Sequence, residues 1–472
     1  MSTAEQPNEQ AKFLTGSLTK HIITMSLTSA VGFVALFVVD LVDMLFISML
    51  GVDELAAAVG FAGTVMFMTT SISIGLGITG GAMVAKSLGQ GSAERATEQL
   101  THVLIVGIVF AICFAAALYA NLFELTGLIG ATGETQALAV SYLKILIPTM
   151  PILLIGIVCS AALRSYGAAR LSMIVTVVAG VVNAVLDPIF IFVLDMGLDG
   201  AAWASVASRV SVAGTGVWYI TRRFGGFAGL NLPALARDLR PIAAIAIPAM
   251  LANVAAPVGG AYVTRAAAEF GEAAVAGMAI IGRVTPIAFA LIFAMSGSIG
   301  PIIGQNFGAG QHDRVRQAFN RSILLIVVYV FPAVAVLFLL RGTIADMFNA
   351  QGVARDLIYL FCGPLSLAWI FTGIIFLGNA AYNNLGHPFY STWVNWGRNT
   401  LGIVPFVYLG SRMWGAEGVL IGQMAGSVFI AITSFILAER LMRSSERDQQ
   451  VPKDETGFVK HRRAINILHT RR

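Results

Sequence analysis

The most constraining feature of this sequence is a succession of apolar runs, each continuing for roughly 20 residues or more, the length that a helix needs to cross a bilayer. Hydrophobic residues make up 57% of the 472-residue chain and charged residues only 12%. Soluble domains carry about twice that share of charge, so a water-soluble enzyme is excluded. The sequence therefore predicts an all-α integral membrane protein that is not an enzyme.

Polar breaks divide the apolar runs into about twelve predicted spans. These are 22–50, 55–83, 97–120, 137–162, 168–194, 199–221, 241–268, 273–300, 318–340, 354–381, 388–411 and 415–442. We expect two six-helix lobes (22–221 and 241–442) around a central cleft, joined by a polar linker (222–240). A polar tail (1–21) precedes the lobes, and a basic tail (443–472) that we expect to be disordered follows them.

The distribution of basic residues predicts the orientation. Most of the 30 Lys and Arg residues lie in alternate loops and in the carboxyl-terminal tail, whereas the opposite loops hold only Arg265, Arg341, Arg355 and Arg412. Cytoplasmic loops collect positive charge, so both termini are expected to be cytoplasmic. The three cysteines are dispersed in apolar runs, which argues against a disulfide framework or a metal cluster. We expect no cofactor and no nucleic-acid partner.

The two halves of the chain resemble each other. Residues 88–95 read LGQGSAER and residues 307–314 read FGAGQHDR. At almost the same offset, 197–201 (GLDGA) pairs with 415–419 (GAEGV), and Gly167 pairs with Gly386. An even number of spans per repeat gives two copies in the same orientation, related by an axis along the membrane normal. Two such lobes with a cleft between them are typical of transporters that work by alternating access.

Acidic residues inside the spans mark the candidate functional site, because a charge at mid-bilayer costs about 2.5–3.5 kcal/mol on insertion scales. Asp40, Asp43 and Asp187 are the acids deepest within predicted spans, all in the first lobe. At 1.5 Å per residue, Asp43 and Asp187 lie about 10 Å below the outer surface and Ser205 about 9 Å below it. Asn183 lies one turn from Asp187 on the same helix face. These side chains are therefore expected to converge.

Two chemistries suit this convergence. Oxygen ligands suit a hard cation. Na⁺ is therefore a candidate ion for this site, with ligands from Asp43, Asn183, Asp187 and Ser205. Alternatively, two close carboxylates share a proton because both do not stay ionised. A purely structural role, in which the acids bond neighbouring helices, is the competing interpretation.

Aromatic and methionine side chains, which repack around varied ligands, are candidates for the lining of the cleft. Ordinary packing is the competing interpretation for each of them. The candidates are Phe61, Met66, Phe67, Met68, Phe289, Phe293 and Met295, with Asn253 as a polar contact.

Several short motifs, taken in order, resemble the multidrug and toxic compound extrusion (MATE) family over about residues 20–442. The motifs are Asp43 followed by Gly51, the loop Gly89-x-Gly91, Leu163-Arg164-x-x-Gly167, Asn183-x-x-x-Asp187-Pro188, and Gly197-x-x-Gly200-Ala201-Ala202-x-Ala204-Ser205. The resemblance implies a monomeric twelve-helix antiporter of a bacterial inner membrane. It would export small organic, often cationic, compounds from the bilayer-embedded cleft in exchange for H⁺ or Na⁺.

The resemblance also implies a cation site. The family's site maps onto Asp43, Asn183, Asp187 and, by spacing, Ser205, where relatives commonly carry Thr. Asp40 has no assured counterpart. The second lobe lacks the seventh-helix glutamate of the NorM-like branch, which favours the DinF-like branch of the multidrug/oligosaccharidyl-lipid/polysaccharide exporter superfamily.

Three alternatives remain open. A lipid-linked oligosaccharide flippase of the same superfamily would present a strongly cationic cavity, whereas the signature of this cleft is acidic. A membrane-embedded prenyltransferase would need several carboxylates at loop depth to hold Mg²⁺-pyrophosphate, for which Asp40 and Asp43 alone are poor support. A channel would carry a repeated filter sequence, and none is visible.

Overall fold

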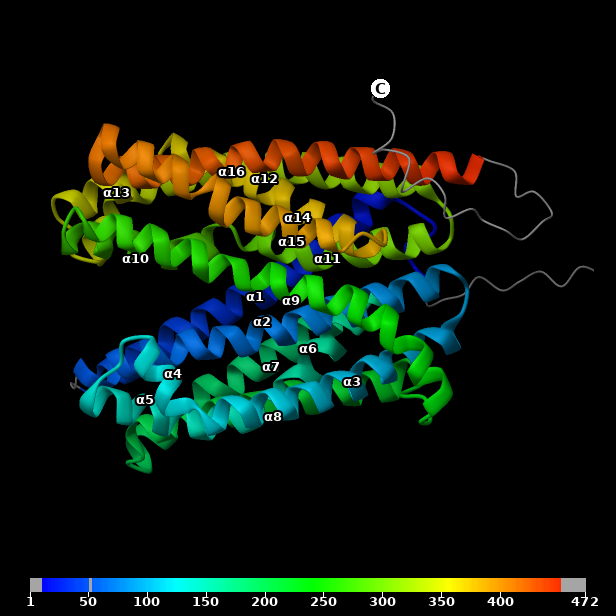
Figure 1. Cartoon of the computed structure of the whole chain (residues 1–472), viewed down its shortest axis with the longest axis horizontal. Helices are drawn as coiled ribbons and strands as arrows, with labels where there is room; N and C mark the ends of the chain where they lie inside the picture. Colours follow the sequence, from blue (N-terminus) through cyan, green and yellow to red (C-terminus); the bar gives the residue numbers. More distant parts are fainter. Residues whose placement is uncertain (1–10, 51–52, 451–472) are drawn as a thin grey trace, which may run out of the picture.

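The computed structural model describes residues 11–50 and 53–450, in which every regular element is a helix (Figure 1). Two bundles lie side by side, and we call them the amino-terminal and carboxyl-terminal lobes. The first lobe contains α1 (Leu18–Ser48), α2 (Asp53–Gly89), α3 (Ala93–Ala120), α4 (Leu122–Leu128), α5 (Gly133–Leu146), α6 (Met150–Ser165), α7 (Ala169–Pro188) and α8 (Gly197–Arg223). The second contains α10 (Glu272–Ala288), α11 (Ala290–Gly308), α12 (His312–Met347), α13 (Val353–Phe361), α14 (Trp369–Asn384), α15 (Phe389–Gly397) and α16 (Val404–Gln450). Helix α9 (Leu232–Ala268) runs between them. Gly51 and the basic tail beyond Gln450 lie outside the described residues.

The twelve predicted spans all correspond to helical units. Within the described ranges, nine segments are long and apolar enough to cross a membrane, and α10 with α11, which meet at a bend of 52°, form a tenth. The segment Phe389–Glu446 is one of these nine. It folds back at Trp414 and Gly415, where the backbone leaves helical geometry. A Cβ on Gly418 would overlap the Gly410 carbonyl, so the two arms pack backbone to backbone as separate spans. Helix α8 is also long enough to cross, although its serines and glycines make it less apolar.

Several predicted spans are broken inside the membrane-crossing region. The span expected at 137–162 consists of α5, a 3₁₀ turn (Ile147–Thr149) and α6, with Pro148 in the turn. The span expected at 168–194 ends as α7 at Pro188 and continues as a π-turn (Ile189–Val193). Proline removes a backbone donor and disturbs the preceding turn, which accounts for both breaks.

Helix α9 belongs to both lobes. Ile242 and Ala246, in its first half, pack in the core of the amino-terminal lobe, whereas Val263 and Ala267 pack in a cluster with α16. The helix is continuous across the expected boundary between linker and second lobe at residue 240. Of the three prolines inside it, Pro248 and Pro257 lie between these two halves, and Pro241 precedes them.

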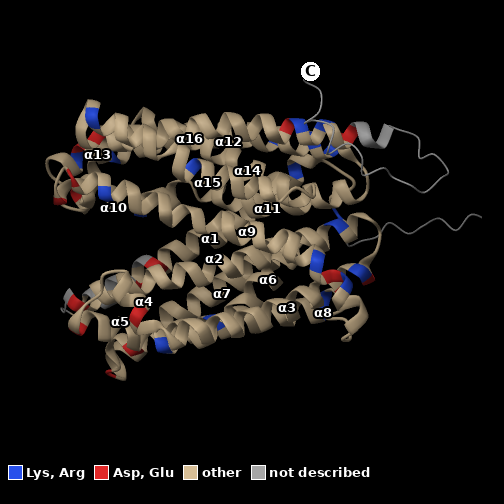
Figure 2. Cartoon of the chain, viewed as in Figure 1, with Lys and Arg blue, Asp and Glu red and all other residues tan. Residues whose placement is uncertain are grey.

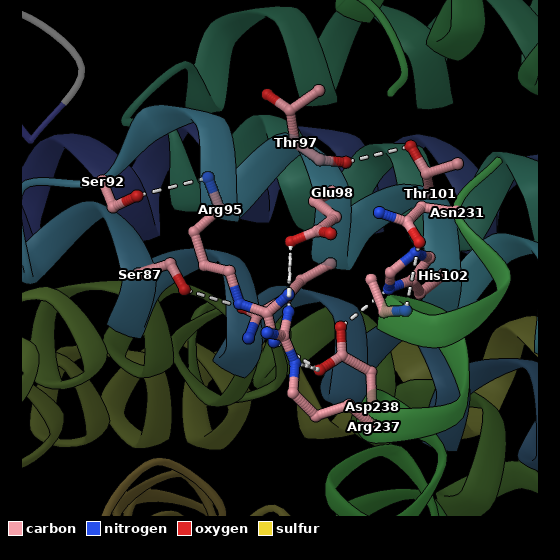
Figure 3. Close-up of polar contacts among 12 residues, drawn as sticks. Ser87, Ser92, Arg95, Thr97, Glu98, Thr101, His102, Asn231, Arg237 and Asp238 are labelled. Carbon is pink, nitrogen blue, oxygen red and sulfur yellow. Dashed lines mark hydrogen bonds and ion pairs between the residues drawn. The ribbon is translucent and has the colours of Figure 1, made fainter. Parts of the chain in front are cut away.

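A buried ion-pair cluster fixes the start of α9 to α3 (Figure 3). The Asp238 side chain, 1% exposed, pairs with Arg95, and its other oxygen lies 2.7 Å from His102 Nδ1. Arg95 also pairs with Glu98, and Arg237 Nη2 lies 3.6 Å from the same carboxylate. The cluster therefore anchors the first half of α9 in the amino-terminal lobe.

Lys and Arg gather at one end of both lobes (Figure 2, right), which we call the basic end; it includes Lys86, Arg95, Arg314 and Arg321. The lobes meet here through α2 and α11. A Cβ on Gly89 would overlap the Gln305 carbonyl, and one on Gly308 would overlap the Lys86 carbonyl. Gly89 and Gly308 are equivalent positions of the sequence repeat, and they lie next to each other where the lobes meet.

Candidate functional site

The candidate site lies where α1 packs against α7 in the amino-terminal lobe. Asp187 is 1% exposed and Asn183, one turn earlier, is 6% exposed. The Asn183 amide Nδ2 donates to Asp187 Oδ2 at 3.3 Å. Asp43, half-buried on α1, lies beside Asp187. Two carboxyl groups this close do not both stay ionised, so the pair is suited to share a proton.

Each carboxyl group keeps one oxygen free. Asp43 Oδ1 and Asp187 Oδ1 are buried and have no hydrogen-bond partner among the described residues. A buried oxygen without a partner is costly, so this pair is suited to receive a further donor or a cation.

Ser205 on α8 reaches the acid pair through a residue that the sequence analysis missed. Tyr142 on α5 lies next to Ser205 and near both Asp43 and Asp187. Arg209, one turn beyond Ser205, donates through Nη1 to the Leu146 carbonyl at 2.8 Å. The same depth estimate applies to Tyr142. It lies five residues into the span predicted at 137–162, which places it about 8 Å below the outer surface.

Asp40 lies one turn from Asp43 and near it, but makes no hydrogen bond to Asp43, Asn183 or Asp187 among the described residues. Its side chain is exposed, and it lies on the face of α1 that also carries Phe33 and Phe37. The Phe37 ring packs edge-on against Phe293 of α11, with centroids 6.2 Å apart. Asp40 therefore lies on the side of α1 that faces the other lobe.

The structure separates the predicted cleft residues into two groups. Phe289 and Met295 are 0% and 1% exposed in the core of the carboxyl-terminal lobe, where the Phe289 ring stacks on Trp369. Fully buried side chains do not line an open cleft, so the prediction is wrong for these two residues in this conformation. Phe61 and Met66 pack against cores of the amino-terminal lobe, because their faces of α2 turn inward.

The remaining candidates are accessible or lie between the lobes. Phe67 and Met68 are 47% and 40% exposed. Phe293 is half-buried and contacts Phe37 of the opposite lobe. The Asn253 amide donates to the Ala249 carbonyl of its own helix at 2.8 Å. Their role in binding substrate remains a prediction.

A membrane-embedded, two-lobed helical fold with an acid pair buried inside one lobe defines a polytopic transporter. Comparison with known proteins gives the family. The MatE family model matches residues 29–189 and 248–409, which covers most of both lobes, and the chain belongs to this family. Its members are transporters of small compounds and not enzymes.

Named relatives cover nearly the whole chain. An FAD transporter of Shewanella oneidensis is 27% identical over 435 residues, covering 91% of this chain and 96% of its own length. The multidrug export protein MepA of Staphylococcus aureus is 20% identical over 421 residues, covering 89% of this chain and 93% of its own. The crystal structure of a mutant Vibrio cholerae MATE transporter, VcmN, superimposes with a TM-score of 0.87 at 25% identity, over 93% of this chain and 99% of that one.

Proposed function

We propose that this protein is a secondary antiporter that exports small organic compounds in exchange for H⁺ or Na⁺. The observation that carries this proposal is the approach of Asp43 to the buried Asp187, with one buried, unpartnered oxygen on each carboxyl group. Such a pair is able to hold one proton or to release it to a competing cation. A purely structural pair would have no need for the two unpartnered oxygens.

Helix α1 is positioned to transmit a change at this pair. It packs against α7, which carries Asp187, and also against α11 of the opposite lobe. Loading of a cation that draws Asp43 and Asp187 together shifts α1 relative to α7, and so alters its contact with α11. Coupling then requires only that cation and substrate favour different arrangements of the lobes.

The basic end is proposed to face the cytoplasm, because cytoplasmic loops collect Lys and Arg. Both termini of the described chain approach this end (Figure 1), so the proposal assigns both of them to the cytoplasmic side of a bacterial inner membrane. The protein is proposed to act as a monomer, with the acid pair in the half of the lobe nearer the opposite surface. Relatives named for FAD and for multidrug export suggest flavin nucleotides and drug-like compounds as substrates to test.

The test is transport in proteoliposomes with a pH gradient and a Na⁺ gradient imposed separately. Asp43→Asn and Asp187→Asn should each lower gradient-driven export about tenfold or more, because neither amide releases a proton at this site. Asp199→Asn is the matched control, since this exposed acid at the start of α8 bonds only to Ser141 among the described residues. Undiminished export in both variants would refute the coupling role, and the gradient that drives wild-type export identifies the cation.

A further inference from the structure

Arg164, at the end of α6, is a half-buried cation that the coupling site does not use. Its Nη1 donates to Ser172 Oγ at 3.0 Å, while Nε is buried without a hydrogen-bond partner. Over residues 11–50 and 53–450, no carboxylate forms a salt bridge with it. The guanidinium therefore has an enclosed, unpartnered N–H and no counter-charge among the described side chains.

The guanidinium opens on a cavity of about 60 Å³ between α1, α6 and α7. Such a volume holds a few waters or one small polar group. Its lining offers hydroxyl groups and apolar surface but no acid: Ser29, Gly32, Phe33, Leu36, Ser172, Met173 and Thr176. A cation and several hydroxyl donors without a carboxylate form a lining that suits an anion.

The cavity lies beside the interface between the lobes. A Cβ on Gly297 of α11 would lie 3.6 Å from Arg164 Nε, and Ser298 Oγ lies 3.1 Å from Ser29 Oγ. Phe33, in the cavity wall, stacks with Phe37, which contacts Phe293 of the opposite lobe. An aromatic surface that bridges the lobes therefore adjoins the proposed anion position.

We propose that Arg164 and this cavity bind an anionic group, a phosphate or a carboxylate, of the exported compound. The substrate class is then an organic anion with an aromatic portion that packs on Phe33 and Phe37, rather than only organic cations. The guanidinium fork matches the oxygens of such groups in a bidentate manner. Because α11 packs against the same side chains, separation of the lobes at this end would open the cavity to the basic end, the side from which an exported anion enters. This inference rests on the proposed export function and names its substrate.

The experiment uses two flavins that share one ring system. FMN carries a phosphate and riboflavin does not, so the ratio of their affinities isolates the anionic group. Binding is measured on the purified full chain in detergent, without any gradient, by quenching of flavin fluorescence. Wild type should bind FMN about tenfold more tightly than riboflavin, the size expected for hydrogen bonds to a charged group. Arg164→Gln should abolish this preference and Arg164→Lys should retain part of it.

Two further variants make the result decisive. Arg170→Gln removes an exposed arginine six residues away and should match wild type. Gly32→Ala keeps Arg164 but places a methyl group in the cavity, 3.6 Å from Thr176 Cβ, which is ordinary contact. It should weaken FMN binding and leave riboflavin unchanged, and it decides the matter if Arg164→Gln does not fold.

Equal affinity of wild type for the two flavins, or an unchanged FMN preference in Arg164→Gln or in a folded Gly32→Ala, would overturn the inference. This readout is independent of coupling. If Asp187→Asn loses gradient-driven export but the wild type shows no preference for FMN, only the proposed anion site is refuted. If the FMN preference depends on Arg164 but Asp43→Asn and Asp187→Asn export fully, only the coupling role of the two acids is refuted.

Discussion

Among single residues, Asp238 is expected to contribute strongly to stability. Its carboxylate is buried between Arg95 and His102, and His102 Nε2 is itself buried without a partner. Removing the carboxylate leaves the buried His102 ring without its partner, while Arg95 keeps only Glu98, and an unsatisfied buried polar group costs about 1–3 kcal/mol. Asp238→Ala should therefore lower the free energy of unfolding by about that amount. Thermal unfolding in nanodiscs measures the effect.

Glu98→Gln is the matched control for Asp238→Ala. Glu98 belongs to the same cluster but its side chain is 23% exposed, so water partly replaces its pairing with Arg95. Exposed pairs contribute at most about 1 kcal/mol. Equal losses in the two variants would contradict the anchoring role of Asp238.

The sequence could predict which polar residues approach one another, but not every partner. Depth along the helices places Asp43, Asn183 and Asp187 at one level, and the structure brings these side chains into contact. Tyr142 was missed because the candidates were chosen among side chains whose burial in a membrane costs free energy, and tyrosine is not one of them. The cleft candidates Phe289 and Met295 were misplaced because hydropathy does not reveal the rotation of a helix that is apolar on all sides.

At the scale of helices, the contact between α2 and α11 depends on glycine. Gly89→Ala would force a Cβ into the Gln305 carbonyl, a backbone atom that has no rotamer to change. Overpacking of this kind costs about 1–3 kcal/mol. The variant should show a lower unfolding temperature than wild type.

Gly63→Ala, on the same helix, provides the comparison for Gly89→Ala. No atom lies within 4 Å of the position of its added Cβ. Alanine is favoured over glycine in a helix by up to about 1 kcal/mol, so this variant should be neutral or slightly more stable. An unfolding temperature for Gly89→Ala as high as that of Gly63→Ala would show that the helices do not depend on this close approach.

The positions of the spans could be predicted from the sequence, but the breaks within them could not. Apolar runs set the length of a helix in a bilayer, which is why the predicted units reappear. The breaks at Ile147–Thr149 and Ile189–Val193 leave hydropathy unchanged. Proline marks both, but membrane helices tolerate proline without breaking, so the residue alone is ambiguous.

At the scale of the molecule, the repeat in the sequence predicted two lobes, and the structure adds where they are joined. The described amino-terminal segment lies between them at the basic end. Phe13, 2% exposed, donates its backbone N–H to Gln305 Oε1 at 3.0 Å and accepts from Arg314 Nη2 at 3.0 Å. Gln305 Nε2 in turn donates to the Ser165 carbonyl of α6 at 2.7 Å. One buried side chain of α11 thus holds both the amino-terminal segment and the opposite lobe.

Gln305→Ala should therefore shift the molecule toward an arrangement that is open at the basic end. The substitution leaves two buried backbone groups, the Phe13 N–H and the Ser165 carbonyl, without their side-chain partner, at about 1–3 kcal/mol each in the closed arrangement. Separation of the lobes lets water reach these groups, so the open arrangement is penalised less. Spin labels at the exposed positions Arg170 and Asp313, one on each lobe, report the separation in a cysteine-free background. Longer label distances are expected in Gln305→Ala than in the parent protein. If the distance distribution is unchanged while transport rates shift, Gln305 acts on transport by some route other than closing this end.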